Sequence, residues 1–149
     1  MTWKQKIYAH YKATLDNKIR DLQAVMSGLK ESSGNETKRT AGDKHETALA
    51  MLQIEQANVG YQLNDLLAKR AVIEKINPSL CTSHIINGSL VKTDHGYFFI
   101  IIAAGKEYID GIAITALSSQ SPLGAKLMGL SAGARVEMAG KHYYIQTVA

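Results

Sequence analysis

Two different spacings of apolar residues divide the chain into two halves. In the first half they recur every three or four positions, which is typical of one buried helix face. The residues are Leu15, Ile19, Leu22, Met26 and Leu29, with Ile7 and Tyr11 extending the row backward. From His84 onward the period shortens to that of strands. The pattern predicts long helices first and a small α+β domain afterwards.

A second helix is predicted from about Glu46 to Ile76, where Asn77-Pro78 ends it. Its row of positions again alternates spacings of three and four: Leu49, Leu52, Gln56, Val59, Leu63, Leu66, Arg70 and Ile73. Between the two rows, Ser32-Ser33-Gly34-Asn35 and the polar stretch to Gly42 predict a break in the helix.

Residues 1–78 are therefore expected to form an antiparallel two-helix coiled-coil hairpin, about 45 Å long at 1.5 Å per residue. Such a hairpin buries only one stripe per helix, so it either projects from the second half or packs against it. The cations along its flanks fit a solvated face: Lys4, Lys6, Lys18, Arg20, Lys69 and Lys75.

Residues 84–149 are predicted to form the second domain. Its expected strands are Ser89–Thr93, Tyr97–Ile102, Ile112–Ala116, Arg135–Met138 and Tyr143–Val148, with turns at Asp94-His95-Gly96 and Ala139-Gly140. One short helix interrupts them. Ser121 is a suitable N-cap for this helix, and proline is favoured at the first helical position, where Pro122 stands. Gly129 can adopt the left-handed backbone conformation that ends a helix.

Composition narrows the class of protein. With 149 residues, the chain holds one domain or two small ones. A single cysteine excludes an intramolecular disulfide and a Cys-rich zinc site. No apolar run approaches the length of a membrane span, and no secretory-type segment opens the chain, so a cytoplasmic location without membrane binding is expected. A net charge of +4 is compatible with a nucleic-acid-associated partner.

Candidate chemistry lies at the hairpin turn, where Asp43 and Glu46 stand three residues apart. As an N-cap and its third helical residue they would form a variant of the capping box. As two carboxylates at the end of a thin arm they would instead hold a divalent cation. The two roles are compatible. Lys38, Arg39 and Lys44 beside them fit either a solvated loop or contacts to phosphate.

Two motifs resemble those of Gre-type bacterial transcript-cleavage factors. The stretch from Ala41 to Ala48, AGDKHETA, is similar to the family's tip motif G-D-x-x-E-N-A. The stretch from Ser121 to Gly129, SPLGAKLMG, followed by Gly133 and Val136, is similar to the signature of its C-terminal domain. The order of a coiled coil followed by an FKBP-like domain also agrees over nearly the whole chain.

The resemblance implies a transcription elongation factor without an enzyme activity of its own. Such factors insert the coiled coil into the secondary channel of bacterial RNA polymerase, where the tip meets nascent RNA. Asp43 and Glu46 would be the catalytic acid pair, which shares the magnesium of the polymerase active site so that backtracked transcripts are cleaved. Ser121, Pro122, Leu123, Gly124 and Gly129 would belong to the domain that docks on the polymerase. The factor is expected to be a monomer.

Several positions depart from the family pattern. Lys44 and His45 stand where Leu-Ser is usual, and Thr47 stands where Asn is usual. These departures keep open a second reading, a channel-binding inhibitor without cleavage activity. An FKBP-like peptidyl-prolyl isomerase would require a deep aromatic pocket. A structural adaptor would leave the apolar row of the helices exposed.

Overall fold

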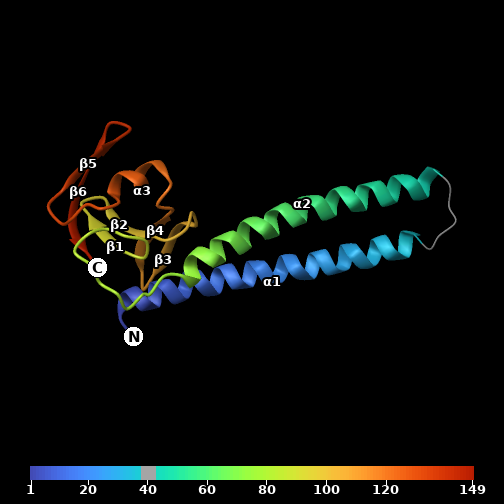
Figure 1. Cartoon of the computed structure of the whole chain (residues 1–149), viewed down its shortest axis with the longest axis horizontal. Helices are drawn as coiled ribbons and strands as arrows, with labels where there is room; N and C mark the ends of the chain where they lie inside the picture. Colours follow the sequence, from blue (N-terminus) through green and yellow to red (C-terminus); the bar gives the residue numbers. More distant parts are fainter. Residues whose placement is uncertain (38–42) are drawn as a thin grey trace. The chain divides into compact units, whose positions relative to one another are not determined.

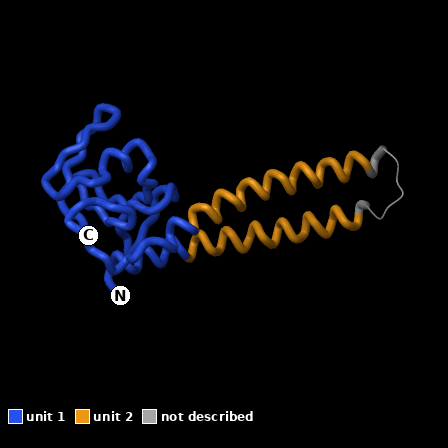
Figure 2. The backbone as a smooth tube through the Cα atoms, viewed as in Figure 1, with its two compact units in different colours: residues 1–12, 71–149 blue, residues 13–70 orange. Residues whose placement is uncertain are grey.

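The computed structural model describes residues 1–37 and 43–149, with side chains described outside residues 36–45. The described residues form two compact units (Figure 2). Unit 1 consists of residues 1–12 and 71–149, and unit 2 of residues 13–70. The helical hairpin is followed by a mixed six-stranded sheet, which confirms the predicted α+β class. That residues 1–78 and 84–149 fold as two separate domains, with a boundary at residues 79–83, remains a prediction.

Two long helices, α1 (Trp3–Thr37) and α2 (Asp43–Glu74) (Figure 1), supply unit 2, except for the start of α1 and the end of α2, which belong to unit 1. Their facing rows are the ones that the spacing predicted. Ile19 and Val59 are buried, and the other row positions toward the turn are half-buried. The positions between rows are mostly exposed, because two helices alone cover only one stripe of each other.

The two polar residues in the row of α2 each make a contact to α1. Gln56 donates through Nε2 to Ser33 Oγ at 2.7 Å and to the Leu29 carbonyl oxygen at 3.2 Å. Arg70 Nε lies 3.3 Å from Asp16 Oδ1. Because a half-buried polar group needs a partner, these contacts fix the pairing of the helices as well as satisfying the groups.

The predicted break at Ser32-Ser33-Gly34-Asn35 is wrong, since α1 continues to Thr37. A Cβ built on Gly34 meets no atom within 4 Å, so this glycine serves no close contact. Glycine in an exposed helix costs about 1 kcal/mol relative to alanine, which a long helix with a packed partner tolerates. The bond from Gln56 to Ser33 supports the helix at this point.

The six strands of unit 1 lie in the order β3-β4-β2-β1-β6-β5. All pairs are antiparallel except β2 with β4, which is parallel. The elements are β1 (Leu90–Thr93), β2 (Gly96–Ile100), β3 (Gly105–Ile109), β4 (Ile112–Leu117), α3 (Pro122–Leu127), β5 (Arg135–Met138) and β6 (Lys141–Val148).

Strand β3 was missed in the sequence because its residues are mostly exposed and polar. Asp110 and Gly111 join it to β4, with φ angles of 54° and 77°. An Asp-Gly pair with both residues at positive φ is the favoured two-residue hairpin turn. That dipeptide was therefore the overlooked signal. The other predicted strands and the Ala139-Gly140 turn are confirmed within a few residues.

Both faces of the sheet are covered within unit 1. On one face, Phe98 and Ile100 join a buried cluster that includes Leu127 of α3. On the other, the ring of Phe99 meets Tyr11 of α1 edge-on at 6.3 Å between centroids. Burial on both sides explains why β2 lies in an unbroken apolar run, as the sequence predicted.

The start of α1 is thus part of the sheet unit. Ile7 is fully buried, and the Tyr11 hydroxyl donates to the Ile114 carbonyl oxygen of β4 at 3.2 Å. Lys4 corrects the solvated-face prediction, because it is only 6% exposed. Its Nζ donates to the Leu80 carbonyl oxygen at 2.7 Å, and burial lowers its pKa. Within residues 1–37 and 43–149, no helix is long and apolar enough to cross a membrane.

Candidate functional site

The helix α2 begins at Asp43, so the predicted acid pair lies in its first turn. Positions three apart lie on one face of a helix, so positions 43 and 46 share a face of the α2 backbone. Glu46 is exposed. Acidic residues in a first turn are also stabilised by the partial positive charge of the helix N-terminus. With Asp43 as the first helical residue, the helix begins one position earlier than the predicted cap requires, so the capping role stays a prediction.

The remaining tip predictions fall outside the described residues. Lys38 and Arg39 lie in the segment 38–42, and the side chains of Asp43 and Lys44 belong to the undescribed range 36–45. Their roles as cap, magnesium ligands and phosphate contacts stay predictions. Among the side chains that are described, no group of three or more His, Cys, Asp or Glu is placed to hold a metal ion.

The C-terminal motif has a local structural explanation. Ser121 is the N-cap of α3, accepting from the Gly124 N–H at 3.1 Å, and its own hydroxyl donates to the Ser118 carbonyl oxygen at 2.7 Å. Pro122 stands at the start of the helix, as predicted. A Cβ on Gly124 would lie 2.0 Å from the Ser118 carbonyl oxygen, so only glycine fits there.

The end of the same motif is also accounted for. Gly129 has a φ of 81°, the left-handed conformation predicted for the helix stop. Leu123 is half-buried against the main core cluster and Leu127 is fully buried in it. These residues build α3, whereas Pro122 and Lys126 are exposed on its outside. If the motif contacts the polymerase, its exposed residues would make that contact. The docking role stays a prediction.

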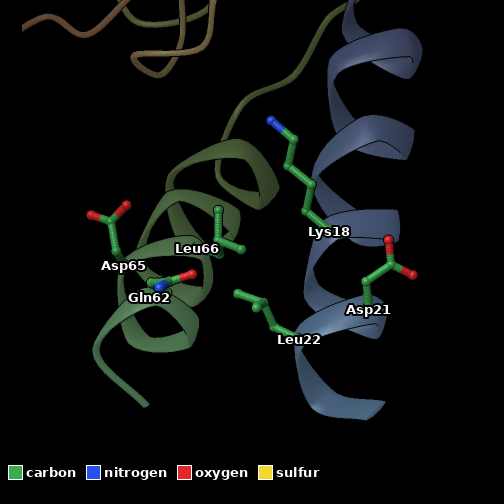
Figure 3. A pocket seen from close by; sticks show the side chains of 6 residues that line it. All are labelled: Lys18, Asp21, Leu22, Gln62, Asp65 and Leu66. Carbon is green, nitrogen blue, oxygen red and sulfur yellow. The ribbon is translucent and has the colours of Figure 1, made fainter. Parts of the chain in front are cut away.

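An open cleft of about 410 Å³ lies beside the apolar row of unit 2 (Figure 3). Leu22 and Leu66 point toward each other across it, with polar residues at its rims. Its six lining residues are Lys18, Asp21, Leu22, Gln62, Asp65 and Leu66. Since the row itself is buried or half-buried, the exposed row expected of an adaptor is not seen in the described part of the hairpin.

The aromatic residues of unit 1 are divided between core and surface. Phe98 and Phe99 are buried in the sheet core. Tyr108 and Tyr144 are 66% and 41% exposed. The one described pocket that is lined by aromatic residues has a volume of about 240 Å³ and mixed polar walls. It differs from the deep apolar pocket that an isomerase requires.

Comparisons with known proteins identify a distant structural neighbour. No protein-family model matches the sequence, and no curated protein matches it. A solved structure of the transcription factor Gfh1 aligns with 92% of this chain and 92% of its own, at 10% sequence identity and a TM-score of 0.36. At that level the alignment supports no statement about this chain, so the family resemblance continues to rest on the motifs of the sequence.

Proposed function

We propose that this protein is a transcription elongation factor that binds RNA polymerase and promotes cleavage of backtracked transcripts. The observation that carries the proposal is the place of the acid pair. Asp43 opens a 32-residue helix that pairs with a 35-residue partner, and Glu46 follows on the same face. Helices of this length span about 50 Å at 1.5 Å per residue. Two carboxylates would thus be presented at the end of a long, thin element that can enter a narrow channel.

The chemistry of the donor set fits magnesium. Magnesium is held by hard oxygen ligands, commonly one or two carboxylates together with water and phosphate. Asp43 and Glu46 would supply such oxygens, while the polymerase would supply the rest of the site. The metal, when bound, stabilises charge on the phosphate and activates water. Lys38, Arg39 and Lys44 would contact phosphates of the nascent RNA.

The test replaces both acids with their amides, Asp43→Asn and Glu46→Gln. Asparagine caps a helix about as well as aspartate, and glutamine keeps the partner of the capping box. The double variant therefore preserves helix α2 and removes only the charges. We expect release of short 3′ fragments from a backtracked elongation complex to be lost, with polymerase binding within about twofold of the parent.

A matched control makes the same two kinds of substitution elsewhere on the hairpin. Asp21→Asn and Glu55→Gln remove two exposed carboxylates away from the turn. This variant should cleave like the parent. If the tip variant also cleaves like the parent, the acids act only as a cap. If the parent binds polymerase and slows elongation without cleavage, the inhibitor reading holds, with Lys44 and His45 as its basis.

A further inference from the structure

A cleft of about 240 Å³ in unit 1 lies where the β1–β2 turn meets strands β5 and β6. Its walls are Asp94 from the turn, Arg135 from β5, and His142, Tyr143 and Tyr144 from β6. The motifs that point to polymerase binding use none of these residues. The site therefore needs an explanation of its own.

The ring of Tyr144 is held in place and remains accessible. Arg135 and Tyr144 are cross-strand partners, and the guanidinium carbon lies 5.8 Å from the ring centroid. The backbone N–H of Tyr144 donates to Asp94 Oδ1 at 2.8 Å, which ties the turn to the strand. The guanidinium thus lies over one face of the ring, and with 41% of its surface exposed Tyr144 remains accessible beside this exposed cation.

The neighbouring residue Tyr143 also lines the cleft, but its ring points to the opposite face of β6 from that of Tyr144 and packs toward the core cluster. Its ring packs edge-on against Phe98 at 5.8 Å and against His95 at 5.1 Å between centroids. The Lys141 ammonium lies 5.7 Å from the same ring. His95 in turn contacts the His142 carbonyl oxygen through Nε2 at 2.8 Å. These contacts join the β1–β2 turn to β6, so the cleft has a preformed wall.

We propose that this cleft binds a nucleotide unit, with the base stacked on Tyr144 and a phosphate at Arg135. Stacking of bases on exposed aromatic rings, combined with cations along the backbone, is the mode by which proteins hold single strands. Asp94 adds an acceptor for a base amino group or a ribose hydroxyl. A simple anion would leave both the aromatic ring and this acceptor unused. Single-stranded RNA, single-stranded DNA and free nucleotide share this chemistry.

The same unit contains a matched comparison. Lys106 Nζ lies 5.8 Å from the ring of Tyr108, which is 66% exposed on strand β3. This pair has a cation and an aromatic ring at nearly the same separation as Arg135 and Tyr144. It does not line the 240 Å³ cleft and has no carboxylate of that cleft beside it. Tyr108→Leu therefore controls for general loss of an exposed tyrosine.

The experiment measures fluorescence anisotropy of labelled ten-nucleotide strands of mixed sequence, as RNA and as DNA, with AMP as competitor. The full chain is used with Lys38→Ala, Arg39→Ala and Lys44→Ala, so that the cations proposed to contact phosphate at the hairpin turn are removed. We expect Tyr144→Leu to weaken binding at least tenfold, and Tyr108→Leu to change it less than twofold. Arg135→Gln should reduce the slope of log K against log salt by about 0.7, the value for one phosphate contact to a single strand.

The outcomes separate the proposal from its alternatives. A selective loss in Tyr144→Leu supports the site, and the relative binding of RNA and DNA together with competition by AMP then identifies the source of the nucleotide. Equal losses in Tyr144→Leu and Tyr108→Leu overturn it, as does a parent that binds none of the three. Circular dichroism melts of both tyrosine variants confirm folding. Because the acid pair plays no part, failure here leaves the cleavage proposal untouched.

Discussion

Replacing Gly124 with alanine tests whether the SPLG motif is required to build α3. A Cβ at this position would lie 2.0 Å from the Ser118 carbonyl oxygen and 2.7 Å from Ser121 Oγ. The first contact is with backbone, which cannot rotate away, so the turn before α3 must open. Overpacking of this kind costs about 1–3 kcal/mol. Opening the turn also breaks the Ser121 cap, which is worth about 1 kcal/mol.

We therefore expect Gly124→Ala to lower the free energy of unfolding by about 3 kcal/mol. In a chain of this size, that corresponds to a fall of roughly 6–12 °C in Tm. Thermal melts followed by circular dichroism would measure it, and Ser121→Ala should account for about 1 kcal/mol on its own.

Gly28 provides the matched control, since a Cβ there meets no atom within 4 Å. Gly28→Ala in the middle of α1 should raise stability by about 0.5–1 kcal/mol, because alanine favours the helix. A Gly124→Ala variant that melts at the parent's temperature would refute the steric reasoning. Gly124 would then be explained by the docking role that the resemblance implies.

Three further outcomes are expected. Burial, aided by the charge of Glu107, raises the pKa of Tyr11 to about 12. Because the tyrosine ionises at lower pH in the unfolded chain, the free energy of unfolding should fall as the pH rises from 10 toward 12. Tyr11→Phe should flatten that fall in urea titrations. Gln56→Ala should cost about 1–2 kcal/mol in the same titrations, because it removes both bonds to α1. Chymotrypsin should cut first at Leu80, because this residue is 51% exposed and lies between the two predicted domains, in the segment Asn77–Ser83. First cuts within Leu49–Ile73 would count against a stable hairpin.

The helical rows were predictable because their positions depend on local spacing alone. Each helix shows its buried side every three or four residues, and the half-buried Gln56 and Arg70 did not disturb that pattern. The end of α1 was not predictable in the same way. Local preference disfavours Ser33 and Gly34 in a helix, whereas the contact from Gln56 that supports them comes from 23 residues away.

The sheet shows the same limit. Strands with a buried face were found from their apolar residues, but the parallel pairing of β2 with β4 depends on packing that no local pattern encodes. The cleft around Tyr144 was missed for a related reason. Asp94 and Tyr144 are 50 residues apart, and only the register of β6 brings them together. Residues of the hairpin turn, by contrast, were found through a contiguous motif.

The placement of residues 1–12 in the sheet unit has a consequence for the order of synthesis. Trp3 meets Tyr97 at 5.0 Å between ring centroids, and Lys6 pairs with Asp110 at 2.9 Å. Residues 1–12 must therefore wait during synthesis for partners made about a hundred residues later. The helix pair of unit 2 depends on closer neighbours in sequence and can form earlier. During that interval Ile7 and Tyr11 stay uncovered, so this apolar segment is exposed to binding by a chaperone.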